Sequence, residues 1–230
     1  MKYNLDLTTI EGDLQYIDNF LTQEELDFFK PYMDDHEGWY TTMRSPYKNI
    51  LNKFISVDLP RRPDGSTGVP SDEPPILHDV FHRPMGIYER LFKVMPPTYR
   101  PHNALQTFKY CTDEEILRDL HPDLKKEYKG KEHEIDFAMS FHCEWSDEST
   151  VPEFNRSLSI YLNDDFEGGI LDFKFKPYKI KPKAGMLVLV PVTHEFTHRV
   201  TKITSGNWRH TLYGASWNGK FPPPSTEETC

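Results

Sequence analysis

Residues 135–144 read IDFAMSFHCE, and their alternation with a period of two indicates a β-strand. Alternate side chains of a strand share a face. One face is apolar and is expected to face the core; it consists of Ile135, Phe137, Met139, Phe141 and Cys143. The other is small and polar and ends in a histidine and a carboxylate; it consists of Asp136, Ala138, Ser140, His142 and Glu144.

Similar segments follow toward the C-terminus. They are expected as strands at residues 156–162, 170–175, 186–190, 198–203 and 209–217. Helical patterns come before residue 130, so helices precede a run of short antiparallel strands. This order predicts an α+β, mainly β chain with a double-stranded β-helix (jelly-roll) core and flanking N-terminal helices.

The N-terminal part supports that core. A strand is expected at residues 14–17, then a helix that begins with a capping box of Thr22 and Glu25. Further helices are expected at residues 76–94 and 113–128, and residues 59–75 are expected to form a long loop because they are rich in Pro, Gly, Ser and Asp. We expect one domain over residues 1–220, with helical support to about 130, the jelly-roll core over about 131–218 and a disordered tail at 221–230.

Charge and cysteine content restrict the function classes. The 230 residues carry a formal net charge of −9, which argues against nucleic acid as the main partner. No apolar run is long enough to cross a bilayer and no secretory signal is recognisable, so we expect no membrane partner. Three cysteines without a Cys-x-x-Cys pair imply neither a disulfide framework nor a zinc ribbon. A soluble, cytoplasmic protein fits best.

His142 and Glu144 are candidate metal ligands. Spaced i, i+2 on a strand, their Cα atoms lie about 7 Å apart and the side chains can converge on one ion. The competing triplet is His121-Pro122-Asp123, which falls inside a helical pattern where positions i and i+2 diverge. Its proline fits a helix start better than a ladder strand, so we favour His142 and Glu144. A His-x-Glu triplet also occurs on ordinary half-exposed strands, so it indicates a metal site only if a third ligand is found.

From Tyr161 onward the chain resembles the prolyl-4-hydroxylase-like branch of the iron(II)/2-oxoglutarate-dependent oxygenases. The resemblance covers about residues 103–217, with a weaker similarity in the helix expected at 21–29. Its pieces occur in the family's order: HCE at 142–144, RSLSIYLNDDF at 156–166, GGILDF at 168–173, IKPKAGMLVLV at 180–190, HRVTKITSG at 198–206 and WRHTLYGASW at 208–217.

The resemblance implies His198 as the third metal ligand. His194 competes in THEFTHRV, but His198 begins an apolar alternation and directly precedes Arg-Val, as in the family pattern. Two histidines and a carboxylate leave positions open for iron(II) and O₂ chemistry. The family usually has Asp where this chain has Glu144, whose extra methylene changes the reach of the ligand.

The cosubstrate pocket is expected on the inward faces of two strands. Ser157, Ser159 and Tyr161 share a face, and buried hydroxyls imply a polar ligand. Arg209 lies on the inward face of residues 209–217, where an unpaired arginine is costly and the far carboxylate of 2-oxoglutarate is its natural partner. The resemblance assigns Tyr161 to the same carboxylate and Tyr110 to its vicinity. His210 points to the opposite face and is expected to be structural.

The resemblance implies a 2-oxoglutarate-dependent dioxygenase that uses iron(II), 2-oxoglutarate and O₂, with ascorbate as a reductant. The implied reaction hydroxylates an amino-acid side chain, free or in a polypeptide, and releases succinate and CO₂. The substrate is a small molecule or a peptidyl group; residues 59–75 and 111–134 are candidate specificity loops. Three alternatives stay open: a catalytically inactive jelly-roll binding protein, an oxygenase of the same family acting on a non-amino-acid metabolite, and a zinc hydrolase using the same ligands.

Overall fold

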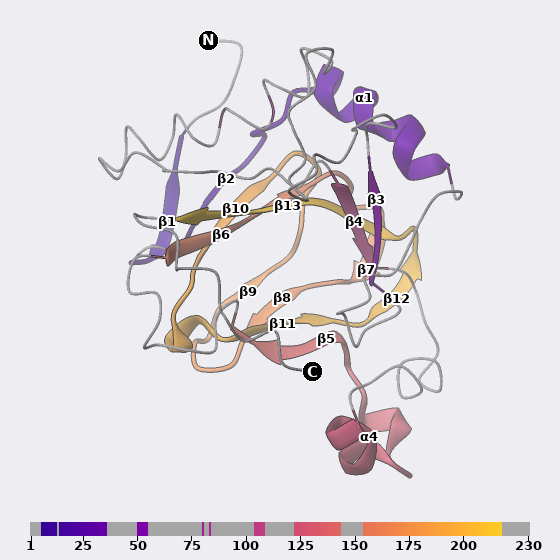
Figure 1. Cartoon of the computed structure of the whole chain (residues 1–230). Helices are drawn as coiled ribbons and strands as arrows, with labels where there is room; N and C mark the ends of the chain where they lie inside the picture. The colour runs from indigo at the N-terminus through magenta and orange to yellow at the C-terminus, as the bar shows by residue number, and fades with distance from the viewer. Residues whose placement is uncertain are drawn as a thin grey trace, which may run out of the picture.

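The computed structural model describes residues 6–12, 14–35, 50–54, 80, 83, 104–108, 122–143 and 154–217. In this part of the chain β-strands outnumber helices, and they form two larger sheets that lie one above the other in Figure 1. The predicted mainly β class is therefore confirmed. None of the helices in these ranges is long and apolar enough to cross a membrane.

The larger sheet has seven strands and forms the upper layer in Figure 1. All of its pairings are antiparallel. In spatial order its strands are β1 (Thr8–Glu11), β2 (Leu14–Ile17), β10 (Leu187–Pro191), β6 (Phe154–Tyr161), β13 (Arg209–Trp217), β4 (Ala104–Phe108) and β3 (Ile50–Phe54).

The smaller sheet has four strands and forms the lower layer. In order these are β5 (Phe137–His142), β11 (His198–Thr201), β8 (Leu171–Phe173) and β9 (Lys179–Ile180). A two-stranded ribbon joins β12 (Ile203–Gly206) to β7 (Phe166–Gly168). The helical elements are α1 (Gln23–Asp34), α4 (Pro122–Tyr128) and the short 3₁₀ turns η1 (Glu132–Glu134) and η2 (His194–Phe196).

Alternation along β6 divides the core into two layers. Leu158 and Ile160 face α1 and pack with its Phe29 in one apolar cluster. Tyr161 belongs to a second cluster, which includes Phe173 of the smaller sheet. The odd-numbered positions of β6 therefore face the space between the sheets, and this is the face on which the sequence places Ser157 and Tyr161.

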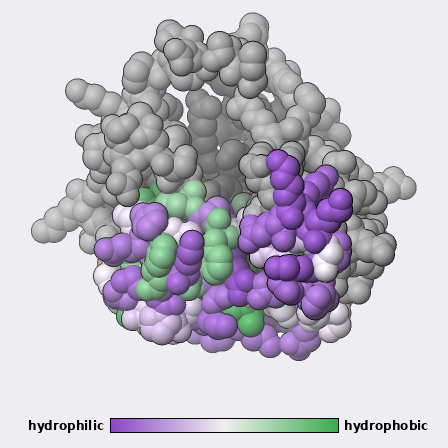
Figure 2. Space-filling model, turned by 90° about the horizontal axis from the view of Figure 1, so that it is seen from below, coloured by the Kyte–Doolittle hydropathy of each residue, from purple (hydrophilic) through white to green (hydrophobic). Residues whose placement is uncertain are grey.

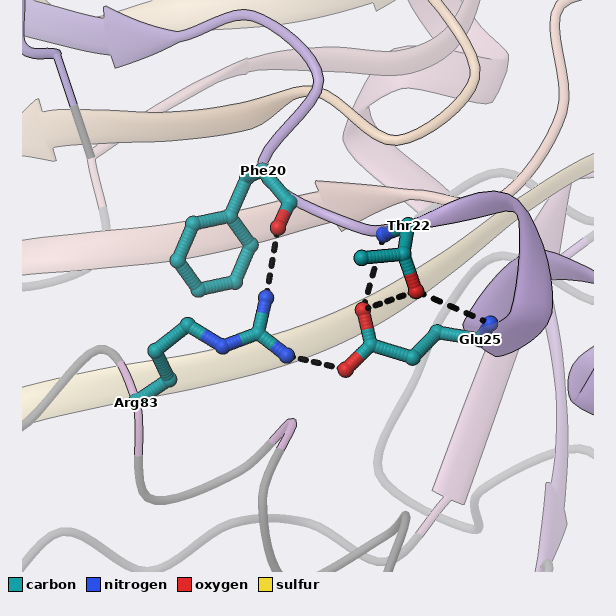
Figure 3. Close-up of polar contacts among 4 residues, drawn as sticks. All are labelled: Phe20, Thr22, Glu25 and Arg83. Carbon is teal, nitrogen blue, oxygen red and sulfur yellow. Dashed lines mark hydrogen bonds and ion pairs between the residues drawn. The ribbon is translucent and has the colours of Figure 1, made fainter. Parts of the chain in front are cut away.

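The N-terminus of α1 is fixed by Glu25, which has two roles (Figure 3). It closes the predicted capping box, because the Thr22 side chain accepts from the Glu25 backbone N–H and the Glu25 carboxylate accepts from the Thr22 backbone N–H. It also forms an ion pair with Arg83, whose guanidinium donates to the Phe20 carbonyl oxygen and lies 4.7 Å from the Phe20 ring centre. A residue distant in sequence therefore anchors this helix.

The Gly168-Gly169 turn allows two backbones to approach closely. Both residues have positive φ, 82° and 62°, where side chains are unfavourable. A Cβ at Gly168 would collide with the carbonyl oxygen of Lys202. The two glycines therefore let the chain pass tightly from β7 to β8.

The predicted core face of β5 is confirmed only for its first residues. Ile135 and Phe137 are buried, and the ring of Phe137 packs edge to face against Tyr128 of α4. Phe141 on the same face is 38% exposed, whereas Ala138 on the predicted polar face is 1% exposed. Alternation shows which side chains share a face, but α4 covers only the first part of this one.

The other strand predictions are confirmed to within a few residues, except that the single strand expected at 198–203 is divided into β11 and β12, which belong to different sheets. The strand at residues 14–17 is confirmed at both ends. Of the helix expected at 76–94, only Val80 and Arg83 are described, both helical. Pro122 begins α4, as expected for a proline in the first helical turn. The predicted loop at 59–75, the start of the helix expected at 113–128 and the tail at 221–230 lie outside the described residues.

Candidate functional site

The structure brings His142 and His198 side by side. His142 is the last residue of β5 and His198 the first of β11, and the two are direct partners in the antiparallel register. Their ring centres lie 4.6 Å apart at an interplanar angle of 60°. At this separation two imidazole nitrogens can reach one ion through bonds of about 2 Å.

Backbone carbonyls orient both imidazoles. Nδ1 of His142 lies 2.8 Å from the Ser140 carbonyl oxygen, and Nδ1 of His198 lies 2.9 Å from the Phe196 carbonyl oxygen. A carbonyl only accepts, so each Nδ1 carries a proton, and in the neutral imidazole Nε2 then carries the lone pair. This tautomer is the one in which a histidine binds a metal through Nε2, with its other nitrogen held by an outer partner.

Glu144 lies outside the described residues, as does His121. Within the described ranges, no group of three His, Cys, Asp or Glu side chains is placed to hold a metal. The two imidazoles are therefore the part of the predicted triad that the structure describes. His194 is separate from them: it is exposed in η2, and its ring lies 4.9 Å from that of Phe175.

Arg209 and Tyr161 form a buried polar pair between the sheets. The two side chains are 2% and 0% exposed, and the guanidinium Nη2 lies 3.3 Å from the Tyr161 hydroxyl. The guanidinium carbon is 4.9 Å from the ring centre of Tyr161. Burial lowers the pKa of Arg209, because the charged form loses its hydration. An anion at this position would offset that cost, and a planar carboxylate matches the guanidinium best.

Hydroxyl groups line the same inward face. Thr211 is the cross-strand partner of Tyr161 and is 2% exposed, and Ser157 is 3% exposed four residues before Tyr161 on β6. Sequence alternation places Thr211 on the face of Arg209 but assigns it no role. Tyr110, the remaining predicted cosubstrate residue, lies outside the described residues.

His210 faces away from this pair. It is 5% exposed, and its backbone N–H donates to the side-chain oxygen of Asn163. Together with Asp27 of α1, Asn163 and Trp208 it lines a separate cavity of about 980 Å³. Neither His142 nor Arg209 lines that cavity, so it is distinct from the candidate site.

Two residues near the imidazoles were not singled out from the sequence. Phe173, at the end of β8, pairs with His198 in the register, and its ring centre lies 5.8 Å from the His198 ring. Arg199 donates to Asp172 of β8 and to Asp136 beside β5. Burial alone would lower the pKa of Arg199, but the hydrogen bond to Asp172 and the charge of Asp136 raise it above its ordinary value. The predicted strands contained both residues. Arg199 directly follows His198 in the sequence, whereas only the register brings Phe173 to the histidines.

A comparison with protein-family models gives one match, described as the 2OG-Fe(II) oxygenase superfamily, over residues 127–217. This range includes both imidazoles, Tyr161 and Arg209. A comparison with curated proteins gave no match.

The fold is similar to solved structures of low sequence identity. The viral collagen prolyl hydroxylase of Paramecium bursaria Chlorella virus-1, in complex with 2OG, is 14% identical, with a TM-score of 0.55 and coverage of 91% of this chain and 97% of the viral one. A prolyl-4-hydroxylase of Pseudomonas putida is 13% identical, with a TM-score of 0.57 and coverage of 90% and 94%. At these identities the similarity concerns the fold.

Proposed function

We propose that the chain is a dioxygenase that depends on iron(II), 2-oxoglutarate and O₂, and that it hydroxylates an amino-acid side chain. The match of residues 127–217 to the 2OG-Fe(II) oxygenase superfamily supports this proposal. A prolyl side chain is the first candidate, because the two similar structures are described as prolyl hydroxylases. The proposed architecture is a single domain over residues 1–220 whose two sheets form a jelly roll. The antiparallel pairing of both sheets supports it.

The proposed iron ligands are His142, Glu144 and His198. The observation that carries the proposal is the 4.6 Å separation of the two imidazoles, each with its Nδ1 held by a backbone carbonyl. Glu144 follows His142 by two residues, so an extended chain would place its side chain on the face of His142. Two histidines and a carboxylate are a donor set suited to iron(II) with open positions.

The proposed 2-oxoglutarate residues are Arg209, Tyr161, Ser157 and Tyr110. Arg209 grips the far carboxylate, and the Tyr161 hydroxyl donates to the same group. The low exposure of both side chains supports this assignment, since a buried guanidinium is stabilised by a buried carboxylate. Ser157, and Thr211 opposite Tyr161, offer further hydroxyl donors along the same wall.

When bound, iron(II) supplies the O₂ chemistry that couples decarboxylation of 2-oxoglutarate to hydroxylation of the substrate. The residues of the chain hold and orient the reactants. The fixed imidazole tautomers present lone pairs to the metal without rearrangement, and the Arg209–Tyr161 pair sets the direction of the dicarboxylic acid. The apolar cluster with Phe173 and Phe196 beside His198 limits the access of water.

The decisive experiment is an anaerobic titration with iron(II) and 2-oxoglutarate, followed by O₂-dependent release of succinate. We expect one metal per chain, and succinate that depends on both additions. His142→Ala and His198→Ala should abolish metal uptake, whereas His194→Ala and His121→Ala should leave it intact. Loss of activity in His121→Ala would instead favour the triplet at 121–123.

The same titration separates the competing functions. An inactive binding protein would take up neither metal nor 2-oxoglutarate. A zinc hydrolase would bind metal but act without 2-oxoglutarate, and it would leave Arg209 and Tyr161 without a role. The substrate is identified by incubating the loaded enzyme with peptide and metabolite mixtures and detecting the gain of one oxygen atom; a product that is not an amino acid would contradict the proposed substrate.

A further inference from the structure

An exposed aromatic pair lies at one end of the smaller sheet. Among the described residues, Phe141 and Phe175 are the large apolar side chains that are exposed, at 38% and 49%. Phe141 directly precedes His142, and Phe175 follows Phe173, the register partner of His198. Both phenylalanines therefore lie at the end of the sheet where the imidazoles are. Figure 2 views the molecule from below, with green apolar surface beside purple hydrophilic surface.

Lys174 lies between the two rings. Its Nζ is 6.0 Å from the ring centre of Phe141 and 5.3 Å from that of Phe175. The imidazole of His194 extends the surface, since its centre is 4.9 Å from that of Phe175. We call Phe141, Lys174, Phe175 and His194 the rim surface.

Lys174 differs from the lysines that follow it. Each of the other lysines at residues 176–183 has a described carboxylate within 4.0 Å: Lys176 has Glu11, Lys179 has Asp172, Lys181 has Glu167 and Lys183 has Asp18. No carboxylate of a described residue lies that close to Lys174. In a chain of net charge −9, this ammonium is held in place by two aromatic faces and not by an acid.

We propose that the rim surface binds an acidic, proline-containing segment of a polypeptide substrate. The ammonium of Lys174 pairs with a carboxylate of the segment, and the exposed parts of the Phe141 and Phe175 rings pack against apolar or prolyl side chains, as aromatic grooves do with extended proline-rich peptides. The inference rests on the proposed function and specifies its substrate as peptidyl rather than free.

The two faces of the sheet explain why the substrate must be long. Side chains alternate along β5, so Phe141 lies on the outer face and His142 faces the interior. Phe173 at the end of β8 packs in the interior cluster, whereas the ammonium of Lys174, the next residue, lies over the Phe141 ring. A ligand that contacts Lys174 and also reaches the imidazoles has to pass around the end of the sheet. A single amino acid is too short for both contacts, because one residue spans at most about 3.6 Å of extended chain.

The test compares two labelled peptides of equal length, alternating Glu-Pro and alternating Lys-Pro, by fluorescence anisotropy on the full chain loaded with metal and 2-oxoglutarate. We expect the Glu-Pro peptide to bind more tightly. Lys174→Gln should weaken its binding about 3- to 5-fold, as for an exposed ion pair, and Lys174→Glu should reverse the preference toward Lys-Pro. Lys181→Gln, which removes the same charge elsewhere on the surface, should change neither peptide's binding.

Equal effects of Lys174→Gln and Lys181→Gln would overturn the proposal, as would tighter binding of an oligo-dT strand than of the Glu-Pro peptide. Succinate release by the same preparations keeps the two claims apart. If the enzyme consumes 2-oxoglutarate but binds the Glu-Pro and Lys-Pro peptides equally, the proposed function stands and the proposal about the rim surface is contradicted. If the chain binds no iron(II), the proposed function itself is contradicted.

Discussion

The guanidinium carbon of Arg199 lies 4.8 Å from the ring centre of Phe141 on the outer face of the smaller sheet. Each of these residues is the direct neighbour of a candidate iron ligand, His198 or His142. Arg199 also pairs with Asp172 of β8 and with Asp136 before β5. One side chain therefore ties together the three strands that end at the imidazoles.

Replacing Arg199 by Met should weaken iron(II) binding as well as stability. The change removes two charge-assisted interactions across the strands, so the free energy of unfolding should fall by about 1–3 kcal/mol. Arg199→Lys keeps the charge but not the planar fork, and it should recover only part of the loss. Metal titration and thermal denaturation of both variants test this, with Lys183→Gln as a surface control. Iron affinity equal to that of the unchanged chain would show that Arg199 has no part in positioning the histidines.

Replacing Arg209 by Met should separate 2-oxoglutarate binding from iron binding. The variant loses the carboxylate grip, so the apparent affinity for 2-oxoglutarate should fall about 100-fold or more, whereas iron(II) should bind nearly as before. The chain without 2-oxoglutarate should not be destabilised much, because burial already disfavours the charged guanidinium. Isothermal titration calorimetry measures the affinities for both ligands. An unchanged dependence of activity on 2-oxoglutarate would show that Arg209 does not bind the cosubstrate.

The two roles of Glu25 can be separated by two substitutions. Glu25→Gln keeps a capping-box acceptor but loses the charge opposite Arg83, whereas Glu25→Ala loses both. We expect Glu25→Ala to lower the free energy of unfolding by about 3–5 kcal/mol, because it removes both the carboxylate opposite a buried cation and the acceptor of the Thr22 backbone N–H, and Glu25→Gln to lower it less, because its amide oxygen still accepts from Thr22. Chemical denaturation gives both values, with the neighbouring Glu24→Gln as the control. Equal losses in the two variants would assign the whole effect to the ion pair.

The Glu11–Lys176 pair should contribute to acid stability. The hydrogen bond from Lys176 and a second one from Tyr178 hold the pKa of Glu11 below its ordinary value of 4.5. A carboxyl group with a lowered pKa stabilises the fold above its unfolded pKa, and this contribution is lost as the pH falls through the folded value. Glu11→Gln should therefore show a shallower decline in melting temperature than the unchanged chain between about pH 6 and pH 3. Glu167→Gln, which removes an exposed carboxylate elsewhere, serves as the comparison, and identical profiles for the two variants would contradict the assignment.

Local patterns predicted about half of the described elements and missed the strands β1, β3, β4, β7, β9 and β12. The period of two placed the strands around residues 137–142 and 209–217, and the Thr22–Glu25 pair marked the start of α1, because strand alternation and helix capping involve residues close in sequence. The same alternation put His142 on one face of its strand and Tyr161 and Arg209 on the inward faces of theirs. These candidate residues follow from the order of amino acids alone.

The tertiary structure decided what local patterns do not contain. Alternation placed Phe141 in the core, yet it is exposed, because α4 covers only the first part of that face. The pairing of Arg83 with Glu25 and the position of Lys174 between two rings join segments whose separation in sequence carries no periodic signal. Sequence determines which side chains share a face, whereas the register between strands and the packing of the layers determine which faces meet.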